Sequence, residues 1–185
     1  MKGRLLVLEG IDGCGKTTQF HHLANWLPSS GLIPRGANLL LTCEPGGTAL
    51  GQALRKLLLN PPYEEEPEPI AELLLYAADR AQHVSQVIKP ALEKGDWVLS
   101  DRFSGSTLAY QGYGRNLDFQ TIKQLEAIAT FGLVADMTIC FELSPLESLA
   151  RRKAKLDDRI ESEGFDFLEK VAKGFLELSQ ENGWI

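Results

Sequence analysis

The stretch from Gly10 to Thr17 carries residues that could bind phosphate. It reads G-I-D-G-C-G-K-T, which fits the phosphate-loop pattern G-x-x-x-x-G-K-[ST]. Glycines let backbone N–H groups converge on one anion, and a helix expected to begin near Lys16 adds its positive end. Lys16 would reach the β- and γ-phosphates of a nucleoside triphosphate, and the Thr17 hydroxyl would bind Mg²⁺.

A second pair of chemically useful residues, Asp101 and Arg102, follows an apolar run at Trp97 to Leu99. Asp101 can hold the water shell of a metal ion. Arg102 places a cation where a hydrolytic enzyme would keep a base for water, so transfer to a phosphorylated acceptor is favoured over hydrolysis. A structural ion pair between the two residues is the alternative. The sequence has no Asn-Lys pair, which a guanine-reading GTPase would need.

Composition narrows the class of protein. The chain has 185 residues and a net charge of −6, which fits one domain over residues 1–185 and argues against nucleic acid or an anionic membrane as the main partner. No apolar run approaches the roughly 20 residues of a membrane span. The cysteines, Cys14, Cys43 and Cys140, have no zinc or disulfide spacing. A cytoplasmic location is expected.

Strand and helix patterns alternate along the chain. Strands are predicted at 4–9, 38–42, 97–100 and 137–143, and helices at 16–27, 48–59, 70–94, 118–130 and about 165–181. We expect the long helix at 70–94 to bend near Pro90, and Ser144 to cap a further helix. Such alternation predicts a parallel sheet covered on both faces, with ligands at the carboxyl ends of its strands.

Five stretches together resemble the bacterial type of thymidylate kinase, over essentially the whole chain. They are E-G-I-D-G-C-G-K-T-T (9–18), E-P-G-G-T (44–48), L-L-L-Y-A-A-D-R (73–80), D-R-F-S-G-S-T-L-A-Y-Q-G (101–112) and D-D-R-I-E (157–161). The resemblance implies a three-layer α/β/α P-loop kinase fold around a central parallel sheet. Four strands are visible and a fifth is expected to be missing at the C-terminus. A short helical lid is expected at about 150–160.

The resemblance also implies an activity: direct in-line transfer of the γ-phosphate of ATP to dTMP, giving dTDP, with Mg²⁺, in a homodimer. The implied ATP-binding loop is Gly10, Ile11, Asp12, Gly13, Cys14, Gly15, Lys16, Thr17 and Thr18. The implied catalytic residues are Lys16, Asp101, Arg102, Arg152 and Arg159, of which the last two are the candidate lid cations. The implied metal ligands are Thr17 and Asp101.

For the acceptor, the resemblance implies residues that contact the base, the sugar and the phosphate of dTMP. Tyr76 would stack on thymine, Arg80 would donate to its O4, and Tyr110 would crowd the 2′ position of the sugar. Asp12 would accept a hydrogen bond from the 3′-hydroxyl, and Arg102 would bind the phosphate. The full set is Asp12, Tyr76, Arg80, Arg102, Ser106, Thr107, Tyr110 and Gln111.

One position departs from the family pattern. Cys43 stands where an arginine usually precedes E-P-G-G-T. If that arginine binds the acceptor phosphate, either Arg102 makes more of the contacts with the phosphate or Arg55 compensates. Two other functions stay open at this stage. A deoxynucleoside kinase would share the phosphate loop and prefer thymidine, and a catalytically inactive nucleotide-binding module would bind ATP without turnover.

Overall fold

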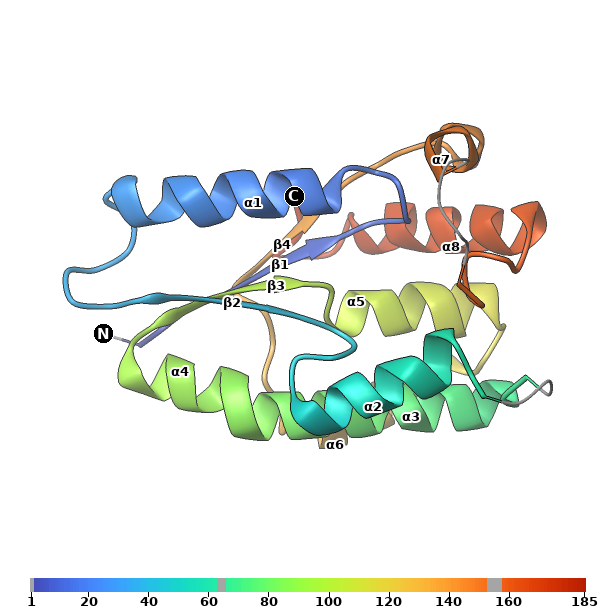
Figure 1. Cartoon of the computed structure of the whole chain (residues 1–185), viewed down its shortest axis with the longest axis horizontal. Helices are drawn as coiled ribbons and strands as arrows, with labels where there is room; N and C mark the ends of the chain where they lie inside the picture. Colours follow the sequence, from blue (N-terminus) through green and yellow to red (C-terminus); the bar gives the residue numbers. More distant parts are fainter. Residues whose placement is uncertain (1, 63–65, 153–157) are drawn as a thin grey trace.

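Four parallel strands form the centre of the molecule. In this computed structural model the described residues are 2–62, 66–152 and 158–185. The strands are β1 (Leu5–Glu9), β2 (Leu39–Cys43), β3 (Trp97–Asp101) and β4 (Met137–Cys140), and their order in the sheet is β2-β3-β1-β4. All of their carboxyl ends therefore meet at one edge, as Figure 1 shows.

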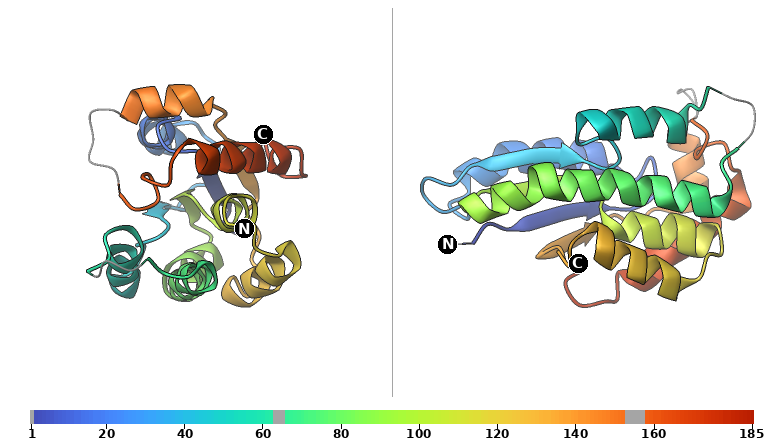
Figure 2. Two further views of the ribbon diagram at one scale, coloured as in Figure 1. Left: turned by 90° about the vertical axis from the view of Figure 1, so that its right-hand side faces the viewer. Right: turned by 90° about the horizontal axis from the view of Figure 1, so that it is seen from below.

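Helices cover both faces of this sheet (Figures 1 and 2). Alternate residues of β1 explain why. Leu5 and Val7 pack with Val84 and Ile88, while Leu6 and Leu8 pack on the opposite side with Leu27. The helices are α1 (Lys16–Trp26), α2 (Ala49–Leu59), α3 (Pro69–His83), α4 (Lys89–Lys94), α5 (Ser104–Thr107), α6 (Phe119–Ala129), α7 (Pro145–Arg152) and α8 (Phe165–Leu178). None in the described ranges is long and apolar enough to cross a bilayer.

The predicted helix at 70–94 is divided. α3 ends at His83, a π-helical turn spans Val84–Ile88, and α4 continues with Pro90 in its first turn. A proline lacks the N–H that an α-helix needs and its ring crowds the carbonyl four residues earlier, so a wider turn ahead of Pro90 accommodates it. The interruption therefore lies before the proline rather than at it.

One helical segment has no counterpart in the sequence prediction. α5 passes into a π-helical stretch at Leu108–Gly114, which packs along α8. A Cβ on Gly114 would lie 2.6 Å from the Phe167 ring, so the close approach of these two elements requires glycine there. The same glycines that permit this packing weaken the local helix signal.

The C-terminal residues extend the sheet. The Thr138 N–H donates to the Gly183 carbonyl at 2.8 Å, and the Ile185 N–H donates back to Thr138 at 2.9 Å. Gly183 to Ile185 thus pair in parallel with β4 through an isolated bridge between Thr138 and Trp184, where the sequence analysis expected a fifth strand to be missing. β4 itself stops at Cys140 rather than at Leu143. Of the expected lid at 150–160, residues 153–157 lie outside the described residues.

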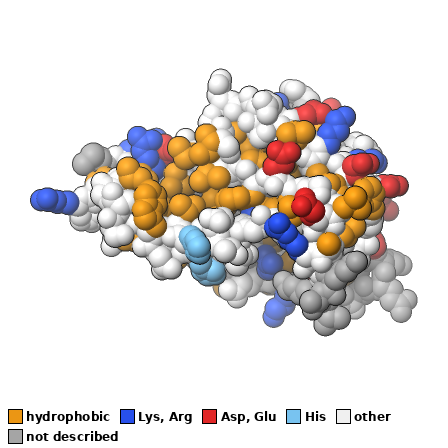
Figure 3. Space-filling model, turned by 90° about the horizontal axis from the view of Figure 1, so that it is seen from above, with side chains coloured by type: hydrophobic (Ala, Val, Ile, Leu, Met, Phe, Trp, Pro, Cys, Tyr) orange, Lys and Arg blue, Asp and Glu red, His pale blue; other side chains and the backbone are white. Residues whose placement is uncertain are grey.

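The face of the molecule that carries α1 is shown in Figure 3. The described acidic and basic side chains on this face are interspersed rather than gathered by sign. His21 and His22 are exposed on α1, as the sequence predicts, and have no role in the site described below.

Candidate active site

The phosphate loop joins β1 to α1 in the strand–loop–helix context that its motif requires. Gly15 precedes α1 with φ 100°, and no side chain caps this helix N-terminus. A Cβ on Gly10 would lie 2.5 Å from the Phe141 carbonyl oxygen, so only glycine fits where the loop leaves the sheet. The loop therefore presents a helix N-terminus to an anion.

Lys16 lies inside this loop and is only 6% exposed. Its Nζ donates to the carbonyl oxygens of Gly10 at 3.0 Å and Ile11 at 2.9 Å. Burial and the charge of Arg102 lower the pKa of Lys16, while Asp12, 3.8 Å away, opposes that shift. The lysine is thus held at the position from which it could meet a bound phosphate.

Arg102 links the phosphate loop to the segment that follows β3. Its Nη1 donates to the Gly10 carbonyl at 3.1 Å and to Ser106 Oγ at 2.9 Å. Its Nη2 donates to Asp12 at 2.6 Å and to Tyr110 Oη at 3.3 Å. The backbone of Arg102 has φ 72°, an uncommon conformation for a side chain of this size, and such strain concentrates at functional sites.

Asp12 completes this group of charges. Burial raises the pKa of Asp12, but the charges of Arg102 and Lys16 outweigh burial and hold the pKa well below its usual value. Asp12 also accepts a hydrogen bond from the Tyr110 hydroxyl at 3.1 Å. The carboxylate is therefore ionised and fixed between the loop and the cleft described below.

The residues predicted to hold Mg²⁺ offer oxygen donors of the right kind. Asp101 Oδ1 is buried and has no hydrogen-bond partner among the described residues, which is unusual for a carboxylate oxygen. Thr17 stands in the first turn of α1. The part of the chain that the structure describes has no group of three acidic, His or Cys ligands. This arrangement fits Mg²⁺, which takes one or two protein oxygens together with water and substrate phosphates.

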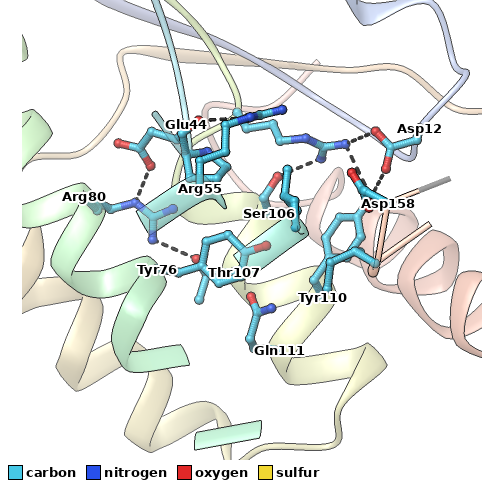
Figure 4. A pocket seen from close by; sticks show the side chains of 14 residues that line it. Asp12, Glu44, Arg55, Tyr76, Arg80, Ser106, Thr107, Tyr110, Gln111 and Asp158 are labelled. Carbon is cyan, nitrogen blue, oxygen red and sulfur yellow. Dashed lines mark hydrogen bonds and ion pairs between the residues drawn. The ribbon is translucent and has the colours of Figure 1, made fainter. Parts of the chain in front are cut away.

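A cleft lined by charged, polar and aromatic side chains opens beside Arg102 (Figure 4). Every residue that the sequence analysis assigned to the dTMP site lines it, although they come from the phosphate loop, α3, the residue after β3, α5 and the following π-helical stretch. The additional lining residues are Glu44, Pro45, Arg55, Leu59, Asp158 and Ile160.

Arg80 forms one end of the cleft and is 2% exposed. Its Nε donates to Glu44 at 2.7 Å, and its Nη1 donates to Thr107 at 2.7 Å and to Glu126. Its Nη2 donates to the Phe103 carbonyl at 3.1 Å. These contacts occupy four of the five N–H donors of the guanidinium, which leaves one on Nη2.

Glu44 is itself held from the far side by His83. The His83 Nδ1 lies 2.8 Å from Glu44 Oε1, and its Nε2 lies 2.6 Å from Thr42 Oγ1. Because a carboxylate only accepts hydrogen bonds, Nδ1 carries a proton. This buried chain from β2 through α3 fixes the direction of Arg80.

The expected lid cations lie in two places. α7 packs on the loop, where Ser148 Oγ donates to the Asp12 carbonyl at 2.7 Å. Arg152 Nη1 donates to the Glu161 carbonyl at 3.3 Å, while its Nε is buried without a partner in the described part of the chain. Arg159 donates to Glu72 on α3 and to the Leu58 carbonyl, and none of its polar contacts among the described residues is with the phosphate loop. The structure therefore does not bring Arg159 to the phosphate loop.

Sequence reasoning missed several buried residues that position these groups. Glu9 ends β1 and accepts hydrogen bonds from the N–H groups of Phe103 and Ser106, each at 2.9 Å. Ser148, His83 and Glu72 act in the same way on other site residues. The only sequence feature that could have indicated these positioning residues is a charged or polar side chain close to a motif. Nothing in the sequence indicates that they are buried.

Comparisons with known proteins agree with this geometry. A family profile described as Thymidylate kinase matches residues 8–185. The thymidylate kinase of Prochlorococcus marinus (strain MIT 9303) is 71% identical over 185 residues, which are all of this chain and 86% of that protein. The chain belongs to the thymidylate kinase family. The thymidylate kinase of Synechococcus sp. (strain WH7803) is 66% identical, over all of this chain and 87% of that protein.

A solved structure shows the same fold. The crystal structure of thymidylate kinase from Ehrlichia chaffeensis is similar with a TM-score of 0.76 and 33% identity, over 98% of this chain and 89% of that chain. The enzyme phosphorylates dTMP to dTDP, with ATP as the phosphate donor. The resemblance and the α/β fold predicted from the sequence are confirmed, whereas a deoxynucleoside kinase and an inactive module are not supported.

Proposed function

We propose that dTMP lies in the cleft with its base at Arg80 and its phosphate at Arg102, opposite ATP on the phosphate loop. The observation that carries this arrangement is the position of Arg102. One guanidinium contacts both the loop, at Gly10 and Asp12, and the cleft, at Ser106 and Tyr110. A cation in that place can bind a phosphate on either side.

The base end suits a pyrimidine carbonyl. The N–H left on Arg80 Nη2 can donate to O4 of thymine, and the buried carboxylates keep the guanidinium from turning away. Tyr76 lies on α3 one turn before Arg80, so its ring and the guanidinium share a helix face. Figure 4 shows the two side chains on the same side of the cleft.

Arg55 supplies a second cation for the acceptor phosphate. It lines the cleft and its Nη1 donates to the Pro45 carbonyl at 2.8 Å. Cys43, which replaces the usual arginine, is exposed at the end of β2. Arg55 is therefore the residue that we propose to supply the charge of the usual arginine at position 43, for which the sequence analysis had left both Arg102 and Arg55 open.

Catalysis then consists of positioning and charge neutralisation. Lys16 and Arg102 stabilise the charge that spreads over the transferring phosphoryl group. Asp12 accepts a hydrogen bond from the 3′-hydroxyl of the dTMP sugar. Thr17 and Asp101 would hold Mg²⁺, which neutralises phosphate charge when bound. Arg152 is the candidate lid cation that stays near the loop, where its side chain lies beside Gly13.

The homodimer is a prediction that rests on the family resemblance, and the cytoplasmic location is a prediction that rests on the composition of the chain.

Isothermal titration tests the placement of dTMP. Wild-type protein and Arg102→Lys are titrated with dTMP and with thymidine. We expect the variant to bind dTMP at least about tenfold more weakly, because a lysine cannot replace the two-pronged guanidinium, and to bind thymidine unchanged. Equal weakening for both ligands would show that Arg102 does not bind the acceptor phosphate.

A further inference from the structure

Glu72 is a buried carboxylate that the mechanism above does not use. It lies on α3 one turn before Tyr76, and its side chain is fully buried. Its Oε1 accepts hydrogen bonds from Gln111 Nε2 at 2.7 Å and from Arg115 Nε at 3.3 Å. Its Oε2 accepts from Arg115 Nη2 at 3.0 Å and from Arg159 Nη2.

The contact with Gln111 decides which way the Gln111 amide faces. An ionised carboxylate only accepts hydrogen bonds, so the NH₂ group of Gln111 must face Glu72. Gln111 lines the cleft, and Figure 4 shows its amide pointing into the cleft with the oxygen on the side of Tyr76. Glu72 thereby turns an ambiguous amide into a fixed hydrogen-bond acceptor.

We propose that Glu72 is a positioning residue for base recognition, which fixes Gln111 so that its oxygen accepts the N3–H of thymine. Thymine presents N–H at N3, whereas cytosine presents a lone pair there. A fixed oxygen would face that lone pair and reject cytosine. The arrangement complements Arg80, which faces O4 at the same end of the cleft.

Two arginines keep Glu72 ionised and still. Arg115 lies between Glu72 and Glu163, with its guanidinium 4.9 Å from the Phe167 ring centre. Burial raises the pKa of Glu72, but hydrogen bonds from Arg115, Gln111 and Arg159 outweigh burial and lower it. The acceptor-only form of the carboxylate is therefore the one present near neutral pH.

The variant Glu72→Gln tests the proposal. Its oxygen is drawn to Arg115 and Arg159, so its own NH₂ faces Gln111 and the Gln111 amide turns around. We expect the KM for dTMP to rise about tenfold with kcat within about threefold, and the ratio of kcat/KM for dTMP to that for dCMP to fall about tenfold. The KM for ATP stays unchanged.

Glu163→Gln is the matched control, because Glu163 pairs with the same two arginines but does not contact Gln111. It should keep the wild-type KM for dTMP and the wild-type dTMP:dCMP ratio. The same loss in Glu163→Gln as in Glu72→Gln would overturn the proposal, since the arginine network and not Gln111 would then be responsible.

A double-mutant cycle with Gln111→Leu separates positioning from general stability. If Glu72 acts through Gln111, adding Glu72→Gln to Gln111→Leu produces no further rise in KM; full additivity contradicts the proposal. Should Glu72→Gln fail to fold in thermal unfolding, Glu72→Asp replaces it. The shorter side chain keeps the charge for the arginines but withdraws from Gln111, and an unchanged KM in that variant would equally sink the proposal.

Discussion

The base end and the phosphate end of the cleft hold their arginines differently. Arg80 is buried among two carboxylates, a hydroxyl and a carbonyl, with one N–H left for a ligand. Arg102 is more exposed, has a strained backbone and shares its guanidinium between a carbonyl, a carboxylate and two hydroxyls. The base end is preorganised, whereas the phosphate end holds cations on protein groups that a phosphate can replace.

This difference has a physical reason. A neutral base gains only a few hydrogen bonds, so its site must be rigid before the base arrives. A phosphate carries enough charge to displace the protein groups that hydrogen-bond to Lys16 and Arg102. Until it binds, those groups lower the free-energy cost of burying the two cations. Substitution of Lys16 should therefore reduce kcat, and substitution of Arg80 should reduce the stability of the protein and raise the KM for dTMP.

The largest effect is expected for Lys16→Ala. We expect kcat to fall by about a thousandfold or more, since an ammonium aimed at the transferring phosphoryl is lost. The thermal midpoint should change little, because the contacts of the Lys16 ammonium within the described residues are all with its own loop: two carbonyls, the Cys14 sulfur and Asp12. A coupled ADP-release assay and a melting curve measure both, and activity within tenfold of wild type would contradict the assignment of the loop.

Arg80→Ala should show the opposite balance. Removing one partner of a buried ion pair costs about 3–5 kcal/mol, because Glu44 and Glu126 are left buried and unpaired. We expect a lower thermal midpoint than in Lys16→Ala and a KM for dTMP raised at least about tenfold, with the KM for ATP little changed. Equal increases in both KM values would mean that Arg80 does not read the base.

Tyr110→Phe tests whether the two ends are coupled through the sugar. The hydroxyl lies 3.1 Å from Asp12 and 3.3 Å from Arg102, and the ring itself is retained. Loss of these hydrogen bonds should lower kcat/KM for dTMP by about three- to tenfold. Steady-state kinetics with dTMP and with its ribonucleotide analogue give the check; preference for the deoxy sugar should persist, since the ring supplies the crowding.

The smallest effect is expected for Cys43→Arg, which restores the usual family residue. Cys43 is exposed, and an exposed charge contributes about 0–1 kcal/mol. We expect the KM for dTMP to fall by no more than about fivefold, and to fall further in an Arg55→Lys background. A rise in KM in both backgrounds would show that Arg55 does not compensate for Cys43.

The sequence alone determined the alternation of strands and helices, the phosphate loop and the shared helix face of Tyr76 and Arg80, whereas the other predicted cleft residues came from the family resemblance. These features are local, because the glycine spacing in Gly10 to Thr17 and the helix-face spacing of Tyr76 and Arg80 involve residues that lie close together in the sequence. The four strands were predicted to within a few residues for the same reason, because apolar runs mark buried strands directly.

Only the tertiary structure decided what each charged residue contacts. Nothing in the sequence predicts that Glu44, Glu72 and Glu126 converge on the side chains of the cleft, or that Arg159 donates to Glu72. Ion pairs and buried hydrogen bonds join residues far apart in the chain, and their partners are fixed by how the helices pack. Local sequence patterns therefore predicted where the functional residues lie in the chain, whereas tertiary packing determined which groups their side chains contact.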